Sequence, residues 1–265
     1  MIKIICLDLD GTLLNSAKEI DSSTITCIKK LKEKEIMVVL TSGRHYNDMK
    51  KYINCLKQKN DKYVICSDGQ YIMSTSGTVL WTNDYLVTYD IKKILSILDI
   101  NRCFAVLEKQ NKIICKGPIS FLVEKAKGLI RGSERVCRVS QISEGLKIEK
   151  LMFFNQTLSE GKRHLLADDY TVHNLQDNRD GFEVLHKNVS KSRAINKLCE
   201  MEDISQDEVL FIGDDYNDAE CIMSLKNTVA MGNASLDIKR LAKHITDTND
   251  MNGVYGVLNK ILEMG

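Results

Sequence analysis

Two acidic residues near the N-terminus, Asp8 and Asp10, directly follow an almost unbroken apolar run. Such a run is typical of a buried strand in a parallel sheet. Because side chains alternate along a strand, both carboxylates are expected on the same side, while Leu9 points into the core. Ligands of open α/β sheets bind at the C-terminal ends of the strands. The pair is therefore a candidate reaction centre.

A second apolar run, residues 209–213, also stops at acids, of which Asp214 is the first. Right-handed βαβ connections place the C-terminal ends of parallel strands on one edge of the sheet, so Asp8, Asp10 and Asp214 are expected to converge there. Two carboxylates about 4 Å apart repel by roughly 4 kcal/mol at an effective dielectric constant near 20. A divalent cation would remove this repulsion, and oxygen ligands without paired histidines favour Mg²⁺ over Zn²⁺.

The order of predicted elements indicates which parts of the chain position these acids. Residues 1–82 alternate strand, helix, strand, helix and strand, which is typical of a parallel sheet covered by helices. Residues 83–180 mix helices and strands in a different rhythm, and the first pattern returns from residue 181. We therefore expect an α/β protein whose Rossmann-like core, residues 1–82 and 181–265, carries an inserted α+β cap, residues 83–180. Helices are expected after the N-cap residues at 21–23, with residues 25, 28 and 31 on one face, and near residues 46–56, 91–98, 119–130 and 191–200. Another is expected to open near residue 217, with short helical segments at the end.

Composition excludes several classes of partner. The chain has 265 residues and a formal net charge of +1, so no overall field favours nucleic acid or acidic membranes. The sequence contains no run of eighteen apolar residues, so no membrane-spanning helix is predicted. The nine cysteines are scattered singly, which indicates reduced thiols in the cytoplasm. We expect a cytoplasmic monomer or weak homo-oligomer that acts on a small molecule.

Four motifs together resemble one known superfamily. They are D-x-D-G-T-L at Asp8–Leu13, T-S-G-R at Thr41–Arg44, the isolated Lys191 that opens a late helix, and G-D-D-x-N-D at Gly213–Asp218. Their order and their strand-end positions are similar to the haloacid-dehalogenase superfamily. The long insert resembles the Cof-like branch with a type IIB cap. Val229–Ala234 and Asp250–Val254 match the closing segment of that branch.

The resemblance implies roles for the two acids of the first motif. Asp8 is the expected nucleophile that attacks phosphorus and forms an aspartyl-phosphate, while Lys191 neutralises charge on the phosphoryl oxygens. Asp10 is expected to protonate the leaving oxygen and then to deprotonate the hydrolytic water. Its neighbour Asp8 should raise the pKa of Asp10, and Thr12 could orient it by a hydrogen bond.

The resemblance also implies ligands and binding groups. Asp8, Asp214 and the main-chain carbonyl of Asp10 are expected to hold Mg²⁺, and Asp218 is expected to support these ligands from behind. Gly11 allows a sharp turn that brings amides close to the phosphate. The residues expected to contact phosphate or substrate are Gly11, Thr12, Ser42, Gly43, Arg44 and Asn217.

Some residues depart from the pattern of the branch. Ser67–Gln70 stands where Asn-Gly-Ala is common, and His45 follows Gly-Arg where proline is frequent. These departures fall outside the groups expected to do chemistry. Contacts between the substrate and Asp68, Gln70 or His45 therefore stay open.

The leading hypothesis is a Mg²⁺-dependent phosphohydrolase for a small phosphorylated metabolite, such as a sugar phosphate, with the insert as a lid that selects the substrate. A sugar phosphomutase is an alternative, because related capped proteins retain the phosphoaspartate. A non-catalytic, phosphate-responsive regulatory or binding module is another, since receiver domains also place acids and a lysine at sheet ends. Dinucleotide binding is disfavoured because no G-x-G-x-x-G follows the first strand.

Overall fold

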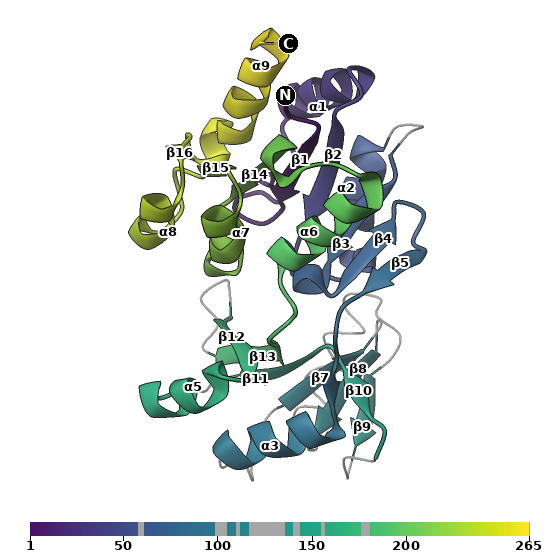
Figure 1. Ribbon diagram of the computed structural model, residues 1–265, viewed down its shortest axis with the longest axis vertical. Helices are drawn as coiled ribbons and strands as arrows, with labels where there is room; N and C mark the ends of the chain where they lie inside the picture. The colour runs from purple at the N-terminus through teal and green to yellow at the C-terminus, as the bar shows by residue number, and fades with distance from the viewer. Residues whose placement is uncertain are drawn as a thin grey trace. The chain divides into compact units, whose positions relative to one another are not determined.

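The computed structural model describes residues 1–57, 61–98, 105–109, 112–116, 136–139, 144–154, 157–175 and 181–264. It divides into two compact units (Figure 1). The first consists of Met1–Asn83 with Ser190–Gly265, and the second of Asp84–Val189. Each unit has its own apolar core. No helix in the described part of the chain is long and apolar enough to cross a membrane.

The sheet of the first unit has the strand order β16-β15-β14-β1-β2-β3-β4-β5. Strands β16 to β3 of this order pair in parallel, while β4 and β5 extend the edge as an antiparallel hairpin. The bounds are β1 Ile4–Asp8, β2 Met37–Thr41, β3 Tyr63–Cys66, β4 Tyr71–Ser74, β5 Val79–Thr82, β14 Val209–Gly213, β15 Asn227–Ala230 and β16 His244–Ile245. The central position of β1 places the first acidic motif between β14 and β2.

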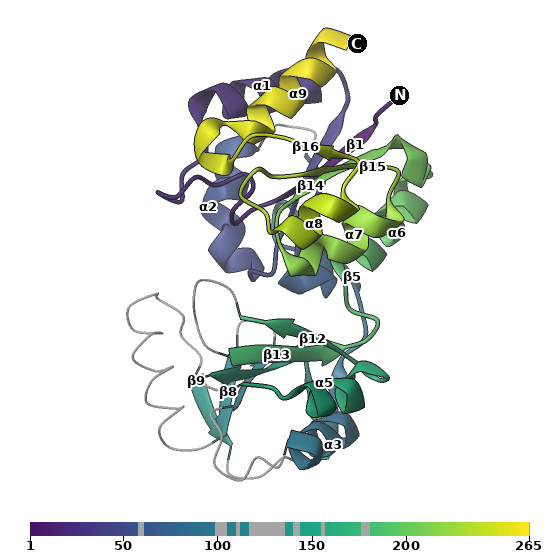
Figure 2. The same ribbon diagram turned by 90° about the vertical axis from the view of Figure 1, so that its left-hand side faces the viewer.

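Helices cover both faces of this sheet, as Figure 2 shows. Alternation along β1 sends Ile5 and Leu7 into one apolar cluster and Ile4 and Cys6 into the other. The first cluster is completed by α1 (Ser22–Glu33), α2 (Tyr46–Leu56) and α9 (Gly253–Met264), the second by α6 (Lys191–Glu202), α7 (Ala219–Ser224) and α8 (Leu236–Leu241). Short 3₁₀ helices are η1 Ser67–Gly69, η2 Gln206–Glu208, η3 Tyr216–Asp218 and η4 Asn249–Met251.

The second unit has a sheet of order β12-β13-β11-β7-β8-β9, and a separate pair, β6 with β10. The bounds are β6 Leu86–Val87, β7 Ala105–Lys109, β8 Lys112–Lys116, β9 Val136–Val139, β10 Lys147–Ile148, β11 Lys150–Phe154, β12 Tyr170–Asn174 and β13 Gly181–His186. Helices α3 (Thr88–Leu98) and α5 (Glu160–Ala167) pack on it. Their apolar side chains meet Leu151, Phe153, Phe182 and Val184 of the sheet.

The predicted fold class, a mainly parallel α/β core with a separate α+β cap sheet, is confirmed. The structure differs in where the chain returns to the core. Residues 181–186 form β13, which pairs antiparallel with β11 and β12, so the second unit extends to Val189 rather than ending at residue 180. The last helix, α9, has 12 residues rather than the short segments expected. The helix predicted at 119–130 lies outside the described residues.

Candidate active site

Asp8 ends β1 and lies against a buried lysine. Lys191 Nζ donates to Asp8 Oδ1 at 2.6 Å and to Asp218 Oδ1 at 2.7 Å. Lys191 is the first residue of α6, where the Ser190 hydroxyl caps the helix by accepting from the N–H of Arg193. Burial raises the pKa of Asp8 well above its ordinary value; Lys191 opposes this, while Asp218 and Asp214 add to it. One lysine therefore does not balance the acids around it.

Asp214, the first acid after β14, is held next to the first motif. Thr12 Oγ1 donates to Asp214 Oδ1 at 2.7 Å. Burial and the negative charge of Asp218 raise the pKa of Asp214 to about 7, despite the hydrogen bond from Thr12. Gly11 has φ +79°, and a Cβ on it would lie 2.2 Å from Asp214 Oδ2. Only glycine can therefore occupy this turn while Asp214 lies so close.

Asp218 is fully buried in η3. Its Oδ2 accepts from the backbone N–H groups of Asp214, at 2.9 Å, and Asp215, at 3.2 Å, while its Oδ1 accepts from Lys191. Asp8, Asp214 and Asp218 each offer a carboxylate oxygen within 4.8 Å of the others. This all-oxygen set, with more negative than positive charge, fits a hard divalent cation. Asp218 belongs to this group, whereas the sequence placed it behind the ligands.

Asp10 has different partners from Asp8. Arg44 donates to both of its oxygens, from Nε at 2.6 Å and from Nη2 at 2.5 Å, and Lys18 Nζ donates at 2.9 Å. Burial alone would raise the pKa of Asp10, but hydrogen bonds and positive charge from Arg44 and Lys18 outweigh it, so the pKa is lowered. The expectation that Asp8 raises the pKa of Asp10 is therefore wrong in this conformation. Thr12 likewise bonds to Asp214 rather than orienting Asp10.

The loop after β2 contains three further predicted binding residues, Ser42, Gly43 and Arg44, while Asn217 lies in η3. Ser42 is buried, its N–H donates to the Ile65 carbonyl, and its hydroxyl accepts from the Arg44 N–H at 3.2 Å. A Cβ on Gly43 would lie 2.8 Å from Asp68 Oδ1, so the glycine makes room for that carboxylate. The Arg44 guanidinium, expected at the substrate, lies on Asp10 and 5.6 Å from the Tyr52 ring centroid.

Asp68 is a buried acid to which the sequence assigned no role. Its Oδ1 accepts from Asn217 Nδ2 at 3.0 Å, and its N–H donates to the Ser42 carbonyl at 3.0 Å. Burial would lower the pKa of Lys191, but the negative charges of Asp218, Asp8 and Asp68 outweigh this effect. The pKa of Lys191 is therefore raised well above its ordinary value. The sequence feature that could have indicated a role for Asp68 is the departure of Ser67–Gln70 from the pattern of the branch. In the structure Asp68 has φ +56°.

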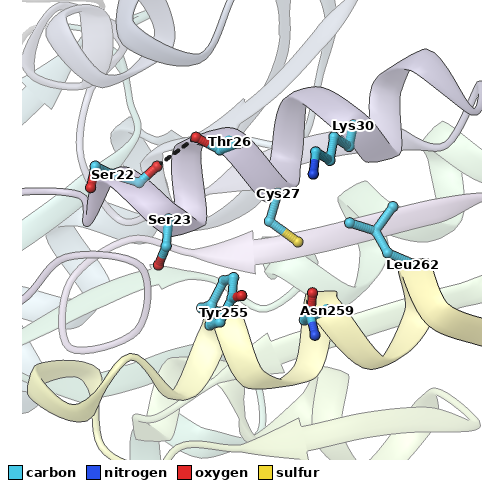
Figure 3. A pocket seen from close by; sticks show the side chains of 8 residues that line it. All are labelled: Ser22, Ser23, Thr26, Cys27, Lys30, Tyr255, Asn259 and Leu262. Atoms are coloured by element: carbon cyan, nitrogen blue, oxygen red, sulfur yellow. Dashed lines mark hydrogen bonds between the residues drawn. The ribbon is translucent and has the colours of Figure 1, made fainter.

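A shallow pocket of about 270 Å³ lies elsewhere, between α1 and α9 (Figure 3). Its walls are formed by Ser22, Ser23, Thr26, Cys27, Lys30, Tyr255, Asn259 and Leu262. It contains no carboxylate and none of the candidate site residues. The acidic strand ends therefore remain the candidate active site.

Comparison with known proteins identifies the family. The model of haloacid dehalogenase-like hydrolases matches residues 5–258. This chain belongs to that family. The phosphatase YwpJ of Bacillus subtilis is 26% identical to this hydrolase, over 98% of this chain and 100% of the relative. The pyridoxal phosphate phosphatase YbhA of Escherichia coli is 21% identical, over 95% of this chain and 96% of its own.

Solved structures share the fold of this haloacid dehalogenase-like hydrolase. The phosphatase BT1666 of Bacteroides thetaiotaomicron has a TM-score of 0.80 at 23% identity, covering 98% of this chain and 95% of its own. The subclass IIB sugar phosphatase BT4131 has a TM-score of 0.77 at 18% identity, covering 98% of both chains. The family and the curated relatives identify the chain as a phosphatase, a phosphomonoester hydrolase. Family membership also implies a metal ion, which the three-acid group fits.

Proposed function

We propose that this hydrolase removes phosphate from a small phosphorylated metabolite with the help of Mg²⁺, through an aspartyl-phosphate on Asp8. The observation that carries the proposal is the contact of Lys191 with both Asp8 and Asp218 at the end of β1, beside Asp214. Relatives that act on pyridoxal phosphate and on 5-amino-6-(5-phospho-D-ribitylamino)uracil support a small phosphorylated substrate.

Asp8 and Asp214, with the main-chain carbonyl of Asp10, would hold the Mg²⁺, and Asp218 lies close enough to join them. When bound, the ion would offset the charge of these carboxylates and of the phosphoryl oxygens. Thr12 keeps Asp214 oriented by its hydrogen bond to Oδ1.

The nucleophilic step belongs to Asp8. A carboxylate oxygen of Asp8 attacks phosphorus, an O–P bond forms, and the bond to the ester oxygen of the substrate breaks. Lys191 stabilises the ionised carboxylate before attack and the phosphoryl charge during it, because its ammonium is fixed by Asp8 and Asp218. Ser42, Gly11, Gly43 and Asn217 are assigned to positioning the phosphoryl group.

The proton transfers belong to Asp10, which gives a proton to the leaving oxygen and then accepts one from the hydrolytic water. In the conformation described here Arg44 and Lys18 keep Asp10 ionised. Asp10 can therefore act as an acid only after its contact with Arg44 is loosened. We assign selection of the leaving group to the second unit.

A phosphate-release screen over phosphorylated metabolites with Mg²⁺ tests the proposal. The comparison uses the wild type, Asp8→Asn, and Asp237→Asn as a surface control whose side chain is 67% exposed. We expect inorganic phosphate from the wild type and the control, and a loss of at least a thousandfold in Asp8→Asn, because an amide cannot form the acyl-phosphate. Turnover of Asp8→Asn within tenfold of the wild type would refute the assignment. An isomerised phosphate ester in place of free phosphate would instead indicate a phosphomutase.

A further inference from the structure

Asn233, which follows β15, lies against the carboxylate of Asp214. Its Nδ2 donates to the Gly11 carbonyl at 2.8 Å and reaches Asp214 Oδ2 at 3.4 Å. Thr12 donates to the other oxygen of the same carboxylate. Among the described residues, Asp214 therefore has one donor on each carboxylate oxygen. Since each oxygen has about two lone-pair sites, each retains one for a cation.

A neighbouring backbone group fixes the orientation of the Asn233 amide. The N–H of Asn249 donates to Asn233 Oδ1 at 3.0 Å. A backbone N–H can only donate, so the amide atom that faces it must be the oxygen. The NH₂ group is thereby directed at Gly11 and Asp214. A flipped amide would place its oxygen against the carboxylate and lose the bond to Asn249.

The segment that carries Asn249 is attached to the same loop of the first motif. Asn249 Nδ2 donates to the Leu14 carbonyl at 2.8 Å, and Asp250 accepts from the N–H and the hydroxyl of Ser16, at 2.7 and 2.6 Å. With the bond from Asn233 to Gly11, three side chains from the C-terminal part of the chain hold this loop. Only Asn233 among these three also reaches a carboxylate of the three-acid group.

We propose that Asn233 is a positioning residue that holds Asp214 in the orientation in which it binds the divalent cation. The inference rests on the proposed function, which makes Asp214 a metal ligand. Hydrogen bonds from surrounding residues orient ligating carboxylates, and removal of such a partner typically weakens metal affinity about 10- to 100-fold. At 3.4 Å the contact is long, so the lower end of that range is expected.

The test is a titration with Mn²⁺, followed by electron paramagnetic resonance, of full-length protein without substrate. Two variants remove the donor: Asn233→Ala, and Asn233→Leu, which retains most of the volume. Asn249→Ala is the matched control, because it removes the bond to Leu14 but retains the backbone N–H that orients Asn233. Circular dichroism on each variant measures folding and thermal stability.

We expect both Asn233 variants to bind Mn²⁺ about tenfold more weakly than the wild type. Asn249→Ala should stay within about threefold, even where its thermal stability falls as much as that of Asn233→Ala. Equal losses of Mn²⁺ affinity in Asn249→Ala and the Asn233 variants would overturn the inference, since the effect would then be structural. Unchanged affinity in the Asn233 variants would overturn it while leaving the proposed function intact. A wild type that binds no Mn²⁺ would overturn the metal site of the proposed function and the inference together.

Discussion

Asp8 and Asp10 are two residues apart, yet the side chains around them carry opposite net charge. The Asp8 cluster, which is Asp8, Asp214, Asp218 and Lys191, has three carboxylates and one lysine. The Asp10 cluster, which is Asp10, Arg44 and Lys18, has one carboxylate and two cations. The side chain of Asp8 is 8% exposed and that of Asp10 is 20% exposed, so water screens the first cluster less.

The Asp8 cluster therefore lacks positive charge, whereas the Asp10 cluster already has enough to neutralise its carboxylate. Like charges about 4 Å apart repel by roughly 4 kcal/mol at an effective dielectric constant of 20, and the buried acids respond by taking up protons. A cation would restore the balance in the Asp8 cluster. The Asp10 cluster needs none, because its carboxylate is already neutralised by protein groups. The two acids therefore differ in their electrostatic surroundings, although they lie within two residues of each other at the end of the same strand.

Loss of Lys191 should give the largest effect on stability. Lys191→Met leaves Asp8 and Asp218 buried without their cation, and breaking a buried pair in this way costs about 3–5 kcal/mol. Urea unfolding in the presence of EDTA measures the free energy of unfolding. Lys197→Met is the control, because the exposed pair of Lys197 with Glu200 should contribute at most about 1 kcal/mol. Equal values for the two variants would show that the Asp8 cluster does not depend on Lys191.

The metal-free protein should lose stability as the pH rises from about 4 to 7. The pKa of Asp214 is raised from 3.8 to about 7 in the folded state. Between these values the folded chain holds a proton that the unfolded chain has released, so a higher pH favours unfolding. Over this pH range the Tm of Asp214→Asn should fall by at least 2–4 °C less than that of the wild type. This difference corresponds to about 1 kcal/mol in a domain of 150–250 residues. Thermal scans in EDTA at several pH values test this, and identical slopes for variant and wild type would contradict it.

The Asp10 cluster should show a smaller effect with the opposite sign. The pKa of Asp10 is lowered, so its pairing stabilises the fold above the ordinary carboxyl pKa and is lost as the pH falls. Arg44→Gln should therefore lower the free energy of unfolding by about 1 kcal/mol at pH 7, as expected for a partly exposed pair, and by less near pH 3. Arg240→Gln, at a side chain that is 77% exposed, is the control. A deficit of the same size at both pH values would show that Arg44 acts through packing rather than through the charge of Asp10.

The sequence was sufficient for the centre of the sheet because β1, β2 and β14 are short apolar runs that stop at or just before a polar residue. Asp8 ends β1 and Asp214 directly follows β14, so the convergence of these two acids could be expected from topology alone. The strand β13 could not be assigned this way. Its residues Phe182–Leu185 are buried in an antiparallel sheet, but the same apolar residues would suit a core strand equally well.

Partners of individual side chains were harder to predict than strand ends. Alternation placed Asp10 beside Asp8, but the strand ends at Asp8, and the turn at Gly11, with φ +79°, follows Asp10. The direction of the Asp10 carboxylate is then set by Arg44, which is 34 residues away. Asn233 lies in the loop after β15, and the sequence distinguishes it only as part of the segment Val229–Ala234. Its contact with Asp214 depends on how two loops pack against each other. No periodic pattern in the sequence predicts that packing.

The most direct test of the charge imbalance in the Asp8 cluster is the thermal unfolding of wild type and Asp214→Asn at pH 7.5, with EDTA and with millimolar Mg²⁺. A ligand that binds only the folded state at 100 times its Kd stabilises it by about 2.7 kcal/mol. We predict that Mg²⁺ raises the Tm of the wild type by several degrees and that of Asp214→Asn much less. A Tm that Mg²⁺ leaves unchanged in the wild type, or raises equally in both proteins, would contradict the claim that the Asp8 cluster is completed by a divalent cation.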